Sequence, residues 1–183
     1  HTKQILSRIH RTPKNGGDRR SLSSDEQLRC HSSIDNGKTP GFTDVYGRLR
    51  WDTPSVTITA KSSTPSCGRF LHPEQDRNIT VREAALIQGF PHSYQFQGPL
   101  VHQYRQIGEA VPPSFARFLA WRVLDFFTPK IRLPRSLFAT PENRLAPDSP
   151  PCQSSAKLKV VDLFCGAGGI ALGFEEAGYE IAF

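Results

Sequence analysis

Apolar residues recur at helical spacing in two stretches of the chain. Residues 79–89 are predicted to form a helix, because Thr80 and Glu83 make a T-x-x-E capping box and Gly89 is a C-terminal stop signal. A second helix is expected to begin at Pro112, where a missing N–H costs nothing. Its apolar stripe, which we assign to the core, consists of Phe115, Phe118, Leu119, Val123 and Phe126.

Two further patterns predict strands. Alternating β-branched residues at Ser55–Thr59 are typical of a short strand. Nearer the C-terminus, the order is an apolar strand (158–164), a glycine turn (166–169), a helix (170–177) and a second strand (179–183). This order predicts the opening β-α-β unit of a doubly wound α/β sheet.

The remaining segments show little periodicity. Residues 1–50 are polar and rich in turn residues, so we expect irregular structure there. Residues 128–157 contain six prolines and are predicted to form a semi-extended linker.

The charge distribution favours a polyanionic partner. The 183 residues include 23 Lys and Arg against 17 Asp and Glu, and residues 1–159 hold all the basic residues but only 13 of the acidic ones. A basic body of this kind favours nucleic acid. The sequence contains no Met, so we interpret the chain as a piece of a longer polypeptide.

Cysteine spacing and hydropathy bear on the compartment. The four cysteines are scattered without metal-ligand spacing, so we predict no metal site and a reduced, intracellular protein. No apolar run approaches the roughly 20 residues of a membrane span. No signal peptide is visible at the N-terminus.

The stretch Asp162–Gly169 reads DLFCGAGG and joins a predicted strand to a predicted helix. Glycines at such a turn let the backbone approach a ligand closely, and the helix N-terminus offers free amides. The G-x-G-G spacing is looser than the dinucleotide fingerprint. From spacing alone, the loop is either a nucleotide-type site or simply a tight turn.

Longer stretches of the sequence resemble the DNA (cytosine-5) methyltransferases. VVDLFCGAGGIALGFEEAGYEIAF (160–183) resembles the family's first motif, which binds S-adenosylmethionine. ITVREAALIQGFPHSYQF (79–96) resembles the ninth motif, and YRQIGEAVPPSFARFLAW (104–121) resembles the tenth. DVYGRLRWDTPSVTIT (44–59) and PSCGRFLHPEQDR (65–77) resemble the end of the target-recognition region. A dinucleotide oxidoreductase would explain the glycine loop but none of the other stretches.

The resemblance covers about residues 8–127 and 158–183. It implies an α/β fold, with the opening β-α-β of a Rossmann-like S-adenosylmethionine-dependent methyltransferase sheet and part of a small irregular recognition region. The implied domains are the end of the target-recognition region (1–78), the ninth and tenth motifs packing on the catalytic domain (79–127), the linker (128–157) and the truncated start of the S-adenosylmethionine-binding domain (158–183).

The resemblance also implies which residues hold S-adenosylmethionine. Phe164 would lie against the adenine and ribose, and the glycine amides near the methionine end. The implied set is Phe164, Cys165, Gly166, Ala167, Gly168 and Gly169 from the first motif, and Gly108, Glu109, Ala110 and Val111 from the tenth. Glu109 stands where the family usually has Asn; ionised Glu only accepts hydrogen bonds, so it either contacts the cofactor's ammonium or caps the following helix. Cys165 is expected to be a small packing residue.

DNA recognition is the second role implied by the resemblance. Arg82 and Glu83 match the RE pair of the ninth motif, which organises the recognition region, and we add Arg48, Arg50 and Arg69 as support. Phosphate contacts, or alternatively a solvated surface, are expected at Arg8, Arg11, Lys14, Arg19, Arg20, Arg29, Lys38, Arg48 and Arg50.

The family's catalytic residues are a cysteine in a Pro-Cys motif, a Glu-Asn-Val motif and an arginine motif. The one apparent match, Pro151-Cys152, is rejected because it lies in the linker and no strand leads into it. We therefore assign no catalytic residue, and we expect residues 1–183 alone to be inactive. Since the tenth motif precedes the first, either the gene is circularly permuted or two methyltransferase units are fused.

The expected function is transfer of a methyl group from S-adenosylmethionine to C5 of cytosine in a specific duplex DNA sequence. By resemblance, the intact enzyme flips the target base out of the helix. We expect it in the cytoplasm at the nucleoid, in a restriction–modification system with a cognate endonuclease or a second methyltransferase subunit. The alternative is a non-catalytic DNA-binding subunit that completes the cofactor site of a split methyltransferase.

Overall fold

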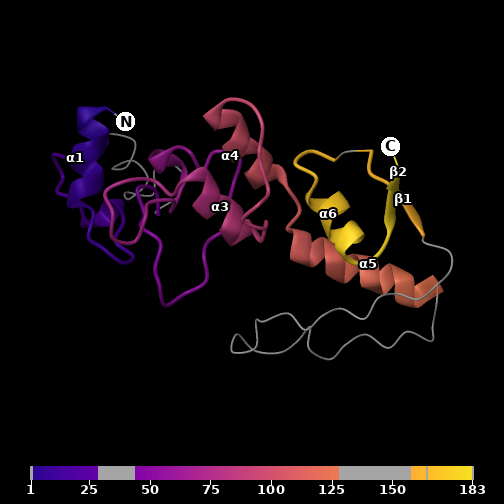
Figure 1. Cartoon of the computed structure of the whole chain (residues 1–183). Coiled ribbons are helices and arrows are strands. Elements are labelled where there is room, and N and C mark those ends of the chain that lie inside the picture. Colours follow the sequence, from indigo (N-terminus) through magenta and orange to yellow (C-terminus); the bar gives the residue numbers. More distant parts are fainter. Residues whose placement is uncertain (1, 29–43, 128–157, 164, 183) are drawn as a thin grey trace, which may run out of the picture. The chain divides into compact units, whose positions relative to one another are not determined.

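The computed structural model describes residues 2–28, 44–127, 158–163 and 165–182 (Figure 1). Its contacts divide the chain into two compact units, His1–Glu109 and Ala110–Phe183. We call these the first and the second unit. The predicted linker lies outside the described residues, and the proposed domain boundaries stay predictions.

The first unit begins with helix α1 (Lys3–Arg11), where the sequence predicted irregular structure. That prediction is wrong. The side chain of Thr2 accepts a hydrogen bond from the Ile5 amide and caps the helix, and Ile9 is fully buried. Short 3-10 turns follow at Arg19–Ser21 and Pro65–Cys67.

Helix α3 (Val81–Gln88) confirms the predicted capping box. The Glu83 amide donates to Thr80 Oγ1 at 3.2 Å, and Glu83 Oε2 accepts from the Thr80 amide at 2.7 Å. Gly89 ends the helix with φ 91°, a left-handed conformation that favours glycine. Helix α4 (Leu100–Glu109), which the sequence analysis did not predict, packs beside α3. Its buried Tyr104 donates from its hydroxyl to the Ile79 carbonyl at 2.6 Å.

The strand predicted at Ser55–Thr59 is not formed among the described residues. The segment is irregular, although its alternation survives in part, since Ile58 is 3% exposed while Thr57 and Thr59 are exposed. β-type pairing in this unit is limited, in the described part, to isolated bridges of Leu71 with Arg48 and Asn78. The alternation of side chains along this segment therefore accompanies an extended backbone that has no partner strand among the described residues.

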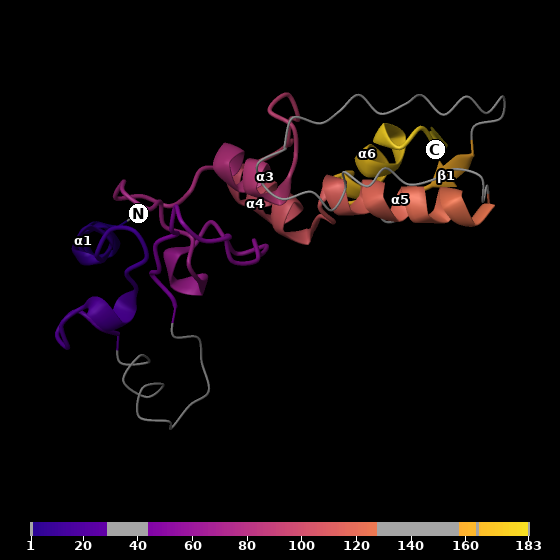
Figure 2. The same cartoon turned by 90° about the horizontal axis from the view of Figure 1, so that it is seen from below.

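The second unit contains helix α5 (Pro113–Phe127), strand β1 (Lys159–Val161), helix α6 (Gly169–Glu176) and strand β2 (Glu180–Ala182). These elements confirm the predicted order of strand, glycine turn, helix and strand. β1 and β2 are parallel, with Val160 opposite Ile181. Figures 1 and 2 both show α6 lying along α5. Their shared core consists of Ala120, Ala177 and Tyr179 with Trp121, Leu124, Val160 and Phe174.

The apolar stripe of α5 corrects one expectation. We predicted it to be core, yet Phe115 is 53% exposed and Phe126 is 80% exposed. The buried positions of α5 are instead Pro113, Ala116 and Ala120. Small side chains face α6 because the two backbones approach closely, and the bulky stripe is left on the other side.

Candidate functional site

The glycine loop of the second unit follows β1 and leads into α6. Gly166 and Gly168 have φ of 45° and 72°, conformations that glycine adopts without steric cost. Gly168 is the N-cap residue of α6, so no side chain caps the first N–H groups of that helix. Leu163 is 80% exposed and Cys165 is also exposed. Phe164, expected beside the adenine, lies outside the described residues. The other loop residues, Ala167 and Gly169, are buried.

Helix α5 supports the glycine loop through α6. A Cβ on Gly173 would lie 2.5 Å from the Pro113 carbonyl oxygen and 2.6 Å from the Ala116 Cβ, so only glycine permits this approach. The Tyr179 hydroxyl donates to the Ala120 carbonyl at 2.8 Å. The helix of the tenth-motif stretch thus directly contacts the helix that begins at the glycine loop.

The tenth-motif residues fall on both sides of the unit boundary. A Cβ on Gly108 would lie 2.1 Å from the Thr59 carbonyl carbon and 2.2 Å from the Ala60 nitrogen, so this glycine packs against the backbone of the irregular segment before α3. The Glu109 carboxylate accepts from Arg105 Nε at 2.8 Å at the surface. The next two residues, Ala110 and Val111, begin the second unit and are partly buried.

Glu83 is the most heavily bonded carboxylate of the expected site residues. Arg77 donates to it twice, at 2.7 and 2.8 Å, and Thr80 donates from both its amide and its hydroxyl. The Arg77 hydrogen bonds, followed by those of Thr80, lower the pKa of Glu83 from its ordinary 4.5 to about 2. Arg77 lies in the irregular segment before α3, so this pair ties that segment to the helix.

Arg82 supports the loop after α3. Its guanidinium donates to the Tyr94 carbonyl at 2.9 Å. The Tyr94 ring packs against Phe90 and Phe96, with ring centroids 4.8 and 5.2 Å away, and those two rings also contact each other. Arg82 therefore fixes a loop from inside the first unit.

Arg48 lies fully buried, with no exposed surface. All five N–H donors of a guanidinium are used here. The acceptors are the carbonyls of Ile9, Thr12, His72 and Gln75 and the carboxylate of Asp76. Arg48 therefore supports the first unit from within, and its expected phosphate contact does not agree with this burial.

The other expected basic residues divide by exposure. Arg69 is largely buried and donates to the carbonyls of Gly16 and Arg48 and to the Asp18 carboxylate. Arg19 is fully buried, which also disagrees with a phosphate contact. Arg8 is partly buried and donates to the Glu26 carbonyl. The exposed members are Arg11, Lys14, Arg20 and Arg50. Arg29 and Lys38 lie outside the described residues.

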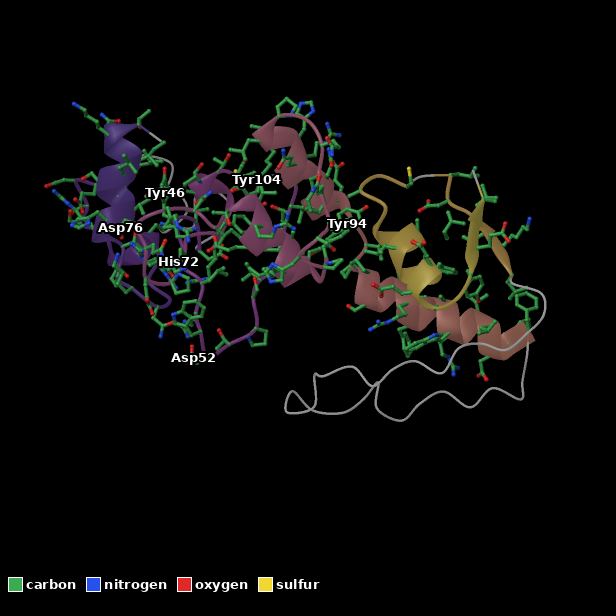
Figure 3. The ribbon with its side chains drawn as sticks, viewed as in Figure 1. Tyr46, Asp52, His72, Asp76, Tyr94 and Tyr104 are labelled. Atoms are coloured by element: carbon green, nitrogen blue, oxygen red, sulfur yellow. The ribbon has the colours of Figure 1, made fainter. Side chains whose placement is uncertain are left out.

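The turn at residues 72–77 was missed as a structural centre, although its sequence was noted for its resemblance. His72 Nδ1 accepts the amides of Glu74 and Gln75 at 3.1 and 3.0 Å. Asp76 binds Arg48, His10 and Lys14, and the Lys14 hydrogen bond is the main reason that the pKa of Asp76 lies far below its usual range. Figure 3 shows His72 and Asp76 in the same part of the first unit. The available signal was the cluster of polar and charged residues 74–77 directly after His72-Pro73.

Other chemistry is sparse in the described part of the chain. Cys67 and Cys165 are free and exposed, whereas Cys30 and Cys152 lie outside the described residues. The described residues hold no cluster of His, Cys, Asp or Glu side chains suited to a metal ion. Within the described ranges, no helix is long and apolar enough to cross a membrane.

Comparison with known proteins assigns the chain to a protein family. The model of the C-5 cytosine-specific DNA methylase family matches residues 1–124. The chain belongs to this family. The match covers the recognition-region, ninth-motif and tenth-motif stretches and ends before the glycine loop.

Individual relatives agree with this assignment. Type II methyltransferase M.AgeI of Thalassovita gelatinovora is 50% identical over 80 residues, which are 44% of this chain and 18% of the relative. Type II methylase M.HgiDII of Herpetosiphon aurantiacus is 46% identical over 101 residues, 53% of this chain and 28% of the relative. DNA (cytosine-5)-methyltransferase 1 of Mus musculus is 46% identical over 83 residues, 45% of this chain and 5% of the relative. The chain thus matches less than a third of each of these proteins.

Proposed function

We propose that the full-length protein is a DNA (cytosine-5) methyltransferase that modifies cytosine C5 in a specific duplex sequence. The observation that carries this proposal is the family match over residues 1–124. Two relatives named as type II methylases favour the modification half of a restriction–modification system, with a cognate endonuclease as its partner. Such an enzyme acts in the cytoplasm, at the nucleoid.

S-adenosylmethionine is the proposed cofactor, and it supplies the methyl group. The glycine loop fits such a ligand, because left-handed glycines and uncapped helix amides lie at the carboxyl end of β1. We further propose that β1, α6 and β2 open a Rossmann-like sheet, in which ligands bind at that edge. The amides of the loop would orient the cofactor, with Phe164 and the tenth-motif residues 108–111 lining it.

The catalytic cysteine is proposed to lie outside residues 1–183, because Cys152 is not preceded by a strand in the sequence. Residues 1–183 would then contribute recognition and cofactor binding without methyl transfer. A split enzyme, in which this chain completes a second polypeptide, remains the competing arrangement.

The test is methyl transfer by the full-length protein. Plasmid DNA would be incubated with radiolabelled S-adenosylmethionine, and methylcytosine would be mapped by bisulfite conversion. We expect label at cytosine C5 within one sequence, and none for Gly168→Val, which places a side chain at the left-handed N-cap. Incorporation of label into adenine would contradict the proposal. A complete absence of incorporation, both alone and after a second polypeptide is added, would contradict it as well. Transfer that appears only after a second polypeptide is added would identify the split enzyme.

A further inference from the structure

The side chain of His72 closes the turn that ends at Arg77. Pro73 lacks an N–H, so the first backbone donors after His72 are the amides of Glu74 and Gln75. Both donate to His72 Nδ1, at 3.1 and 3.0 Å. The His72 amide donates in turn to the Arg77 carbonyl at 2.9 Å. The imidazole therefore acts as an asparagine side chain does in an Asx-turn, where a side-chain acceptor binds a backbone amide two residues further along.

The two hydrogen bonds to Nδ1 require a neutral imidazole. An amide N–H can donate only to an unprotonated ring nitrogen, which leaves the proton of the neutral ring on Nε2. His72 Nε2 lies 3.9 Å from Glu83 Oε1 on α3. Protonation of Nδ1 would direct an N–H toward two other N–H groups and remove both hydrogen bonds. The imidazolium form of His72 is therefore incompatible with the closed turn.

The charges around His72 are balanced in number. Arg77 and Arg48 are the cations that face it, and Glu83 and Glu74 are the carboxylates. The side chain is buried, and this burial, followed by Arg77, lowers the pKa of His72 below its ordinary 6.5, against the raising effect of the carboxylates. A ring that burial keeps neutral is suited to the acceptor role of Nδ1.

Three other segments of the first unit attach to the closed turn. Arg48 donates to two of its carbonyls, at 3.0 and 2.7 Å, and the Asn15 amide donates to a third at 2.9 Å. The Trp51 indole donates to the Glu74 carboxylate at 2.9 Å, and its ring meets the His72 ring edge-on at a centroid distance of 5.7 Å. Opening of the turn would therefore disturb contacts with all three segments.

We propose that His72 is a pH-sensitive switch in the first unit: the neutral imidazole closes the turn by accepting two backbone amides, and protonation of Nδ1 opens it. Acid then loosens the contacts of Arg48 and Trp51 with the turn. The stabilisation of the closed turn is complete above about pH 6.5 and decreases as the pH falls below that value, because the open turn binds the proton more readily. The switch involves neither DNA nor a cofactor.

The first test is NMR of the full-length protein with isotope-labelled histidine nitrogens, titrated from about pH 7.5 to 5. The His72 signals are identified by their absence from His72→Asn. At neutral pH we expect an unprotonated Nδ1 and a protonated Nε2, and we expect the ring to titrate below pH 6.5. A proton on Nδ1 at neutral pH, or a titration above pH 6.5, would overturn the proposal.

The second test separates the acceptor from the ring. His72→Asn keeps a side-chain acceptor but does not titrate, whereas His72→Phe keeps a ring beside Trp51 without an acceptor. Hydrogen exchange of the Glu74 and Gln75 amides, corrected for the intrinsic effect of pH, measures the opening constant of the turn. In the wild type this constant should rise by up to about tenfold per pH unit below about pH 6.5. It should not depend on pH in His72→Asn, and at neutral pH it should be largest in His72→Phe.

His92→Asn is the matched control, because His92 is an exposed histidine of the same unit. This variant should keep the pH dependence of the wild type. A wild-type opening constant that does not change with pH would overturn the proposal, as would a His72→Asn protein that opens with the pH dependence of the wild type. The comparison of these two proteins decides the question even where His72→Phe does not fold.

The exchange measurement requires no methyl transfer, so this proposal and the proposed function fail separately. A protein whose turn opens in acid through His72 but which never methylates DNA would contradict only the proposed function. A protein that methylates cytosine, with a turn that is insensitive to pH, would contradict only the switch.

Discussion

At the scale of the residue, Arg48 shows how one guanidinium organises an irregular region. It joins the end of α1, through the carbonyls of Ile9 and Thr12, to the turn at 72–76. Removing one partner from a buried charged network leaves the others unsatisfied in a low-dielectric interior. The first unit, which has little sheet in its described part, depends on such contacts for its shape.

We expect Arg48→Lys to destabilise the protein by about 3–5 kcal/mol, because a lysine ammonium has three donors and cannot reach acceptors on two sides. Urea unfolding monitored at the tryptophans measures this loss. Arg50→Lys, at an exposed neighbour, is the matched control and should change stability by less than about 0.5 kcal/mol. Equal losses of stability in the two variants would refute the conclusion that the buried hydrogen bonds of Arg48 stabilise the first unit.

The lowered pKa of Glu83 predicts how the stability of the protein depends on pH. Its pKa in the folded protein is about 2, below its ordinary 4.5, so the unfolded state binds the proton more readily. The stabilisation by Glu83 is therefore complete above about pH 4.5 and is lost as the pH falls toward 2. The destabilisation caused by Glu83→Gln should shrink across this window in denaturant titrations. Glu109→Gln, which removes an exposed ion pair, is the control and should destabilise the protein by at most about 0.5 kcal/mol. A Glu83→Gln effect that does not depend on pH would contradict the assignment.

At the scale of the element, the α5–α6 contact depends on small residues. Alanine is about 1 kcal/mol better than glycine inside a helix, yet Gly173→Ala should destabilise the second unit by about 1–3 kcal/mol through overpacking against Pro113 and Ala116. Hydrogen exchange of the α6 amides would report it as faster opening. Glu175→Ala, exposed in the same helix, is the control. Slower exchange in Gly173→Ala would show that the helices can separate without cost.

The elements also differ in how far sequence predicts them. Helix α3 was predicted closely, because Thr80, Glu83 and Gly89 act on backbone groups within a few residues. Helix α4 was missed although its apolar residues, Leu100, Val101, Tyr104 and Ile107, recur at helical spacing. Only the structure shows that Tyr104 and Ile107 are its buried pair and that the helix lies beside α3. The strand at 55–59 failed for the converse reason, since alternation does not reveal whether a neighbouring strand exists.

At the scale of the whole molecule, the order of the motifs has structural consequences. The second unit joins the helix of the tenth-motif stretch to the helix of the first-motif stretch, through Gly173 and Tyr179. Chain ends that lie close in a fold are suited to being joined by a linker. This contact is compatible with a circularly permuted gene, which is one of the two arrangements that the motif order allows. The other, a fusion of two methyltransferase units, predicts a second glycine loop upstream in the full-length sequence.

Substitution of Cys152 tests whether this cysteine is the catalytic nucleophile. We expect Cys152→Ser in the full-length protein to methylate DNA at the wild-type rate, because a nucleophile needs a positioned, activated thiolate and Cys152 lies in a proline-rich segment. Rates of label transfer under saturating DNA measure this. The control is serine at the Pro-Cys motif of the full-length enzyme, which should abolish transfer. A Cys152→Ser protein without activity would make Cys152 the nucleophile.

The sequence by itself determined the local elements and the family: the capped helix α3, the start of α5, and the strand–glycine turn–helix–strand order of the second unit. These features depend on hydrogen bonds and dihedral preferences among residues close in the chain. Only the tertiary structure decided that Arg48 turns inward, that Gly108 packs on Thr59, and that Phe115 and Phe126 of α5 are exposed. Burial depends on contacts with carbonyls and side chains that are distant in the sequence, and the spacing of residues along the chain does not specify those contacts.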